Sequence, residues 1–268
     1  MSELTELLIT PAPQIERVAL AIARDAYPAV DARHYLQELD RLAAPLYRAV
    51  VDRPALADRA SWLVAYLFDE LGFLCSASRP AEPRCSYLNE VLERRIGTPV
   101  ALAVVVLALG ERVGLPVDGI AIGGQLFVTL GGSPGVILDL SRRGRVVEPD
   151  PLGQLVGQRP GRDAGEPCHA ERVSARDIAL RLLLELKQAH QHLCNHPLAM
   201  VVCDRLVDLT NAPLHYRDRG LHALALGAPA VAASDLSVYL TEAPDAVDAA
   251  QVRRLLDQAE EGKRRPAH

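Results

Sequence analysis

Ser86-Tyr-Leu-Asn-Glu-Val-Leu-Glu-Arg-Arg-Ile-Gly-Thr-Pro-Val-Ala-Leu-Ala103 is the stretch of this chain that decides its fold. Its first half places apolar side chains at helical spacing and predicts a helix over residues 87–95, which the following glycine ends. Thr98 is then a good N-cap, and Pro99 suits the first position of a second helix. Residues 100–109 are apolar on every side. This second helix is therefore predicted to lie buried at the centre of the domain.

The residues on either side of this stretch predict helices before it and a small sheet after it. Most of the first 70 residues have helical spacing, most clearly over residues 58–71. Residues 117–122, 126–130 and 136–140 are rich in strand-forming residues and are separated by glycine turns, and residues 145–148 are a candidate fourth strand. The pattern predicts an α+β fold, a helical bundle packed on a short antiparallel sheet.

An internal repeat marks the C-terminal third of the chain. Val207-Asp-Leu-Thr-Asn-Ala-Pro213 matches Val238-Tyr-Leu-Thr-Glu-Ala-Pro244 at an offset of about 31 residues, near the ~34 residues of a tetratricopeptide (TPR) unit. Small residues and a proline stand where such a unit has its helix contacts and turns: Gly220, Gly227, Ala232 and Pro244. We predict one and a half to two units, followed by a capping helix over residues 248–261.

The composition indicates a soluble globular protein. Hydrophobic residues make up 49% and charged residues 24% of the chain, and the low aromatic content of 4% favours a helical core of Leu, Val and Ala. A net charge of −5 gives no general attraction to nucleic acid or to anionic membranes. No apolar run reaches the ~20 residues of a membrane span, and the start of the chain does not resemble a signal peptide. Five dispersed cysteines without a C-x-x-C pair predict reduced thiols and a cytoplasmic location.

The order of these motifs resembles the bacterial SirB-type family, in which a transglutaminase-like domain precedes TPR repeats. The resemblance covers roughly residues 36–256, and it is carried by Ser86–Asn89, Val91–Arg95, Gly114–Pro116 and Tyr216–Leu221. It implies a papain-like core followed by an all-α TPR-like region. The expected division is an N-terminal helical extension at 1–35, a transglutaminase-like core at 36–165, a Gly-rich loop at 153–167 and TPR-like helices at 174–262.

The papain-like plan places a Cys at a helix start and a His and an Asp on strands, and this chain departs from that plan. The helix start holds Thr98 and Pro99 in place of the Cys, and Gln125 stands where the His is expected. Only the Asp of the plan is present, as Asp139. Family members commonly carry a Ser two positions after the Pro, which Ala101 replaces. Gln does not titrate near neutral pH, and a hydroxyl without an adjacent base is a poor nucleophile. We therefore expect no conventional Cys-His-Asp chemistry.

Other polar residues are candidates for binding or for relocated chemistry. Asn89 and Glu93 share a helix face at i, i+4, where they either orient the loop before the central helix or line a pocket. Cys85 is a rival nucleophile, although an inert, half-buried thiol is the plainer interpretation. His169, next to Cys168, is the only imidazole near this region by sequence.

Three further groups are interpreted as structural. We expect Asp139 to cap a turn and to pair with Arg142 or Arg143. A second group consists of His190, His192, Cys194 and His196. Because no second cluster at zinc-ligand spacing follows in the sequence, we interpret it as a solvated helix end rather than a metal site. The pair Arg217 and Arg219 is interpreted as part of a solvated face.

Two functions are compatible with these residues. The leading hypothesis is a non-catalytic binding or regulatory protein that engages a protein or peptide partner, without a cofactor, metal, nucleic acid or membrane. Its candidate binding residues are Asn89, Glu93, Thr98, Gln125 and Asp139. The alternative is an enzyme of a specialised pathway that uses the remodelled pocket for acyl or amide transfer, hydrolysis or non-covalent catalysis on a small molecule, with Cys85 or Thr98 as the candidate nucleophile.

Overall fold

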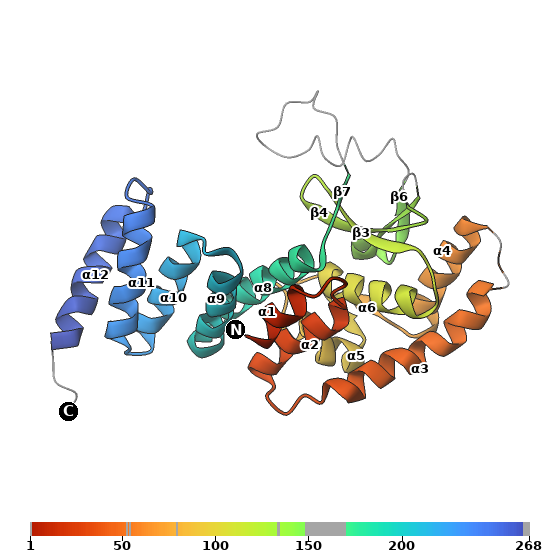
Figure 1. The fold of residues 1–268 in the computed structure, drawn as a ribbon, viewed down its shortest axis with the longest axis horizontal. Helices are drawn as coiled ribbons and strands as arrows, with labels where there is room; N and C mark the ends of the chain where they lie inside the picture. The colour runs from red at the N-terminus through yellow and green to blue at the C-terminus, as the bar shows by residue number, and fades with distance from the viewer. Residues whose placement is uncertain are drawn as a thin grey trace, which may run out of the picture. The chain divides into compact units, whose positions relative to one another are not determined.

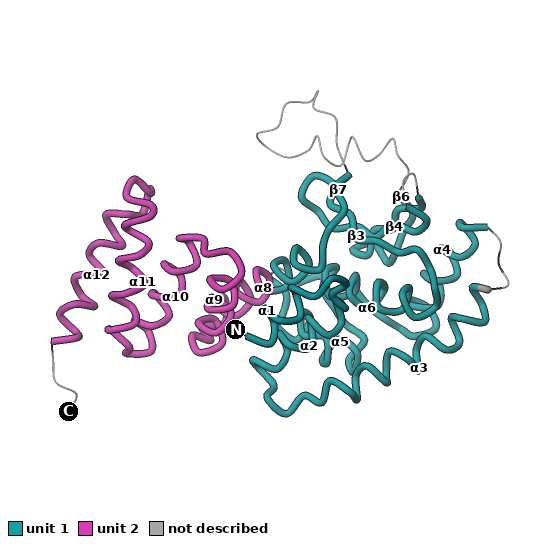
Figure 2. The backbone as a smooth tube through the Cα atoms, viewed as in Figure 1, with its two compact units in different colours: residues 1–182 teal, residues 183–268 magenta. Residues whose placement is uncertain are grey.

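The computed structural model describes residues 2–51, 53, 55–78, 80–132, 135–147 and 170–264. The chain divides into two compact units, residues 1–182 and 183–268, which Figure 2 colours separately. The first unit combines helices with a small sheet, and the described part of the second is helical (Figure 1). The predicted α+β class, with a mixed core before an all-α region, is confirmed.

The first unit is built around α6 (Pro99–Arg112), the predicted central helix. Its residues from Val100 to Val106 are all buried, and it packs against α2, α3, α5 and the sheet. This environment explains why the helix has no polar face. The unit also contains α1 (Glu3–Leu8), α2 (Ile15–Ala26), α3 (Ala32–Val51), α4 (Leu56–Ala65), α5 (Leu88–Arg94), the first residues of α8 (Ala175–His192) and two short 3₁₀-helices, η2 (Pro83–Cys85) and η3 (Leu140–Arg142).

Two helix ends differ from the sequence-based expectation. α5 ends because Arg95 takes the left-handed conformation, at φ 58°, that a glycine usually supplies at a helix end. Gly97 instead belongs to a short strand. The helix predicted over residues 58–71 is α-helical only in α4 and continues as the π-helix η1 (Tyr66–Glu70).

An antiparallel sheet of five strands follows α6, in the order β6-β5-β4-β3-β7. Its strands are β3 (Val117–Ile122), β4 (Gln125–Leu130), β5 (Val136–Asp139), β6 (Arg145–Val147) and β7 (Glu171–Arg172). The four predicted strands are confirmed, and β7 was not predicted. A separate parallel pair joins β1 (Leu74–Cys75) to β2 (Ile96–Gly97). The loop predicted at residues 153–167 lies outside the described residues.

The two faces of the five-stranded sheet have different surroundings. Val117 packs so closely on Gly110 of α6 that a Cβ on this glycine would lie 2.6 Å from a Val117 methyl group. Val117 pairs with Leu130 of β4. The fully buried Leu138 pairs with Val128, which lies on the same face of β4 as Leu130. This face therefore packs on α6. The opposite face carries a separate apolar cluster of Ile120, Ile122 and Phe127.

Helical hairpins form the second unit, as the repeat predicts. The unit takes the C-terminal part of α8 (Ala175–His192), then α9 (His196–Thr210), α10 (Pro213–Ala225), α11 (Pro229–Glu242) and α12 (Ala249–Arg264). The two copies of the repeated sequence span the ends of α9 and α11, and consecutive helices from α9 to α12 pack on one another. Gly220 lies at the α10–α11 contact, and Gly227, at φ 70°, forms the turn between these helices. The predicted all-α region is confirmed, and α12 lies where the capping helix is expected to follow the one and a half to two units.

Buried ion pairs join the helices of the second unit. Lys187 Nζ of α8 lies 2.7 Å from Asp218 Oδ2 of α10, and both residues are buried. Arg217 also donates to Asp218, and Arg219 donates two hydrogen bonds to the buried Asp235 of α11. The interpretation of Arg217 and Arg219 as a solvated face is wrong, because their side chains are only 24% and 17% exposed.

Three buried histidines should make the second unit sensitive to mild acid. Burial lowers the pKa of His190, and burial together with nearby cationic Lys187 lowers that of His215. Burial and the neighbouring His196 lower the pKa of His222; the two Nδ1 atoms are 3.1 Å apart. A histidine with a lowered folded pKa contributes stability that is complete above its unfolded pKa of ~6.5 and is lost as the pH falls toward the folded pKa. We expect the urea midpoint, followed by circular dichroism, to fall between pH ~7.5 and pH ~5.5.

The variant His222→Gln provides the control for this pH dependence. Glutamine can hydrogen-bond but does not titrate, so the fall in the urea midpoint should be smaller in the variant. A midpoint that stays constant or rises on acidification of the unmodified protein would contradict the prediction.

Candidate functional site

The start of α6 holds Thr98 at the position where a papain-like enzyme carries its thiol. The residue is 3% exposed. Its Oγ1 accepts a hydrogen bond from the Ala101 N–H at 3.2 Å, and its N–H donates to the Cys85 carbonyl at 2.8 Å. The predicted N-cap is confirmed, with Pro99 at the first helical position. The hydroxyl is therefore buried and serves to hold the helix start.

Strand pairing places Gln125 and Asp139 on the sheet face that points away from α6. Gln125 pairs with Ile122, whose side chain belongs to the apolar cluster of that face. Asp139 follows Leu138, which lies on the α6 face, so its own side chain points to the other side. Gln125 is also exposed. At the start of β4, the residue on the α6 side is Leu126, which cannot titrate either.

Asp139 forms the capped turn that the sequence predicts. It is 8% exposed, and its Oδ1 accepts hydrogen bonds from the Ser141 N–H at 2.9 Å and the Ser141 hydroxyl at 2.5 Å. Its Oδ2 lies 3.6 Å from Arg142 Nε. Arg143 instead donates from Nη2 to Asp69 Oδ1 at 2.8 Å. The contacts of Asp139 are those of a structural carboxylate.

The thiols and imidazoles of the first unit do not form a pair among the described residues. Cys85 is 4% exposed, so it is buried rather than half-buried. Cys168 and His169 lie outside the described residues. The one histidine that the structure describes in this unit is His34 of α3, and it lines a cavity with no cysteine among its lining residues.

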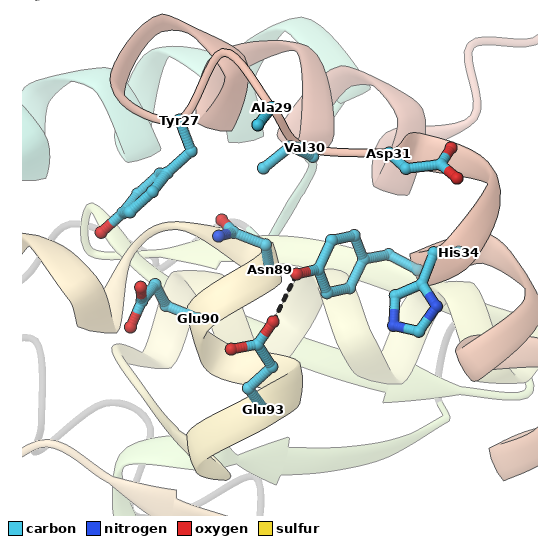
Figure 3. Close-up of a pocket in the computed structure, with 9 residues that line it drawn as sticks. Tyr27, Ala29, Val30, Asp31, His34, Asn89, Glu90 and Glu93 are labelled. Carbon is cyan, nitrogen blue, oxygen red and sulfur yellow. Dashed lines mark hydrogen bonds between the residues drawn. The ribbon is translucent and has the colours of Figure 1, made fainter.

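This cavity brings together two of the predicted binding residues, Asn89 and Glu93. It has a volume of about 380 Å³ and lies between α5 and the connection from α2 to α3 (Figure 3). Asn89 is 4% exposed, and its Oδ1 accepts no hydrogen bond from the residues that the structure describes. The Tyr35 hydroxyl donates to Glu93, as the dashed line shows. The other lining residues are Tyr27, Ala29, Val30, Asp31, His34 and Glu90.

The electrostatics of the cavity keep its two tyrosines protonated. Burial, the hydrogen bond to Glu93 and the charges of Glu93 and Glu90 raise the pKa of Tyr35 to about 12. Burial, followed by the charge of Glu90 and a hydrogen bond to it, raises the pKa of Tyr27. Both hydroxyls therefore stay protonated at neutral pH, and that of Tyr35 donates to Glu93.

Sequence reasoning identified the α5 side of the cavity but not its other wall. Tyr27 and Tyr35 are more than 50 residues away along the chain, and no periodic pattern connects them to α5. Their one sequence signal is compositional: two tyrosines close together in a chain with 4% aromatic residues.

The histidine-rich segment of the second unit forms a helix end and a turn. His190 and His192 lie in the last turn of α8, Cys194 in the turn at φ 53°, and His196 begins α9. His190 is 2% exposed, so the interpretation as a solvated end is wrong for this residue. Among the described residues, no group of three or more potential ligands could hold a metal ion.

Comparisons with known proteins agree with the fold. A model of the transglutaminase-like superfamily matches residues 33–184, and a tetratricopeptide-repeat model matches residues 186–257. A UPF0162 protein of Xylella fastidiosa (strain 9a5c) is 31% identical over 250 residues, covering 91% of this chain and 89% of the relative. A UPF0162 protein of Pseudomonas aeruginosa is 28% identical, and the match covers 74% of this chain and 72% of the relative. Protein SirB1 of Salmonella typhimurium is 24% identical, covering 78% of each.

The chain therefore belongs to the transglutaminase-like superfamily, in the family of UPF0162 proteins that includes SirB1 and carries C-terminal TPR repeats. The predicted resemblance is confirmed. No solved structure matches the chain significantly. In the part of the chain that the structure describes, none of the helices combines the length and apolar character needed to cross a bilayer.

A change at the helix start tests the structural role of Thr98. Thr98→Ala removes the N-cap acceptor and should lower the free energy of unfolding by about 1 kcal/mol. Thr98→Ser keeps the oxygen and should cost less. Urea denaturation of the three proteins, followed by circular dichroism, measures both effects. Equal losses in the two variants would mean that the hydroxyl does not cap α6.

Proposed function

We propose that this chain is a non-catalytic binding protein that engages a protein or peptide partner. The observation that carries the proposal is the buried Thr98 hydroxyl, which caps α6 at the position where a nucleophile is needed. The leucine and glutamine at the start of β4 supply no base. The TPR match supports a protein or peptide as the partner, because paired helices present grooves that suit peptide chains. The free, dispersed thiols support a cytoplasmic location.

Thiol reactivity of the native full-length protein tests the non-catalytic part of the proposal. Limiting iodoacetamide at neutral pH, with site-resolved mass spectrometry, ranks all five cysteines against one another. Cys194 is exposed and serves as the internal reference for an ordinary thiol. We expect Cys85 and Cys168 to react no faster than Cys194. A much faster reaction at either residue would identify an activated thiolate and overturn the proposal.

Peptide selection tests the binding part. A random peptide library is panned on the native protein, and enriched peptides are titrated by fluorescence anisotropy. We expect at least one peptide to bind saturably and to remain chemically unchanged after prolonged incubation. Cleavage or amine modification of a bound peptide, or failure of every enriched peptide to saturate, would contradict the proposal.

A further inference from the structure

We propose that the cavity lined by Asn89, Glu90 and Glu93 binds a cationic nitrogen group, either an alkylammonium or a guanidinium. The group would be presented by a small amine or by a basic side chain. This binding does not depend on the protein-binding function proposed above, since it concerns one cavity of the transglutaminase-like unit.

The hydrogen-bonding groups of the cavity favour a ligand that donates. Asn89 is 96% buried and its Oδ1 accepts no hydrogen bond from any described residue, although buried polar atoms are almost always paired. The Tyr35 hydroxyl donates its hydrogen to Glu93. The carboxylate oxygens of the lining therefore remain as acceptors for a ligand, and the unpaired amide oxygen of Asn89 lies buried beside them.

The charge of the lining favours a cation. Asp31, Glu90 and Glu93 contribute carboxylates, and no lysine or arginine is among the lining residues. Arg84 and Arg94 lie close enough to lower the pKa of Tyr27, but neither lines the cavity. Arg94 is 3.8 Å from Glu82, a carboxylate outside it. An anionic ligand would face three carboxylates with no cation among the lining residues to offset them.

The shape of the cavity suits a charged group on an apolar stem. Tyr27 and Tyr35 line the cavity together with Asn89, and aromatic rings attract cations. Ala29 and Val30 also line the cavity and offer apolar contacts for methylene groups. The volume of about 380 Å³ is near the small end of ligand pockets and has room for a small amine or one basic side chain.

A titration with simple probes tests the proposal on the full-length protein. n-Butylammonium, methylguanidinium and the neutral n-butanol are added in turn, and the side-chain amide of Asn89 is followed by two-dimensional NMR. We expect the cations to shift this signal saturably and n-butanol to bind at least about tenfold more weakly. The variant Glu90→Gln/Glu93→Gln should also weaken n-butylammonium at least about tenfold. Glu70→Gln, which removes an exposed carboxylate outside the cavity, should leave binding unchanged.

Nα-Acetyl-lysine methylamide distinguishes the two sources of the cation. Tighter binding than n-butylammonium would assign the cavity to a basic side chain of a peptide, and equal or weaker binding would assign it to a free amine. The proposal is overturned if n-butanol binds as well as n-butylammonium, if neither cation shifts Asn89, or if Glu70→Gln weakens binding as much as the double variant. The thiol-labelling experiment is independent of these titrations. Failure of this proposal is therefore distinguishable from failure of the proposed function.

Discussion

Replacing Asp218 with Ala should destabilise the second unit by about 3–5 kcal/mol, because it leaves Lys187 buried without its carboxylate. The side chains of Lys187 and Asp218 are 8% and 7% exposed, with their charged atoms 2.7 Å apart. The ammonium also lies 3.4 Å from His215 Nδ1, a ring whose pKa is lowered by burial and by Lys187 itself. A neutral imidazole does not replace the lost charge. Urea denaturation followed by circular dichroism measures the loss.

Two comparisons isolate the buried charge as the cause. Asp245→Ala removes an exposed carboxylate of the same unit and should change stability by less than about 0.5 kcal/mol. The second comparison is pH. Burial alone would raise the pKa of Asp218, but hydrogen bonds and charges from Lys187 and Arg217 hold it below its ordinary value. Its stabilisation is therefore complete above the unfolded pKa of ~3.9 and is lost as the pH falls through the folded pKa. If the difference in the free energy of unfolding between Asp218→Ala and the unmodified protein persists below the folded pKa of Asp218, the ion pair is not its cause.

The features that sequence could predict in the second unit are the local ones. The positions of Gly220 and Gly227 follow from the repeat, because close helix contact and a left-handed turn each restrict the residue type. The ion pairs of Arg217 and Arg219 could not be predicted in the same way. A charged residue on a helix gives no sign of whether another helix covers it, and that information appears only when α10 and α11 are packed together.

The same distinction separates the parts of the candidate site. Thr98 and Pro99 begin α6 through contacts within four residues, so their roles were predictable. The direction of Gln125 was not, because alternation assigns a side chain to a face only once the strand register is known, and a shift of one residue reverses it. The cavity around Asn89 required contact between α5 and a segment more than 50 residues earlier. Sequence spacing carries no information about such a contact.

The structure also gives structural reasons for the presence of Thr98 and Asp139. Thr98 and Asp139 each satisfy a local backbone requirement, at the start of α6 and at the turn of η3. These requirements belong to the scaffold and do not depend on chemistry at the site. Retention of an acid at Asp139 is therefore weak support for an active enzyme, because the carboxylate is already used by Ser141 and Arg142.

Replacing Gly220 with Val should destabilise the second unit by about 3 kcal/mol, the upper range for overpacking a well-filled contact. A Cβ at Gly220 would lie 3.0 Å from both Cγ and Cδ2 of Leu236, and 3.2 Å from the Cβ of Asp235. Leu236 is fully buried in α11 and cannot move aside freely. Valine adds two further methyl groups at this point, and the small gain in helix propensity over glycine does not offset the clash. Urea denaturation of the full-length protein measures the loss.

A double-mutant cycle shows whether the contact with Leu236 is the cause. Leu236→Ala alone should cost about 2–5 kcal/mol by leaving a cavity. In the double variant, valine fills part of that cavity, so the combined loss should be smaller than the sum by at least about 1 kcal/mol. Gly227→Ala is the matched control: a Cβ there meets no atom within 4 Å, and φ is 70°, so it should cost only the ~1–2 kcal/mol of left-handed backbone. Strict additivity of Gly220→Val and Leu236→Ala would show that α10 and α11 do not pack closely through this pair.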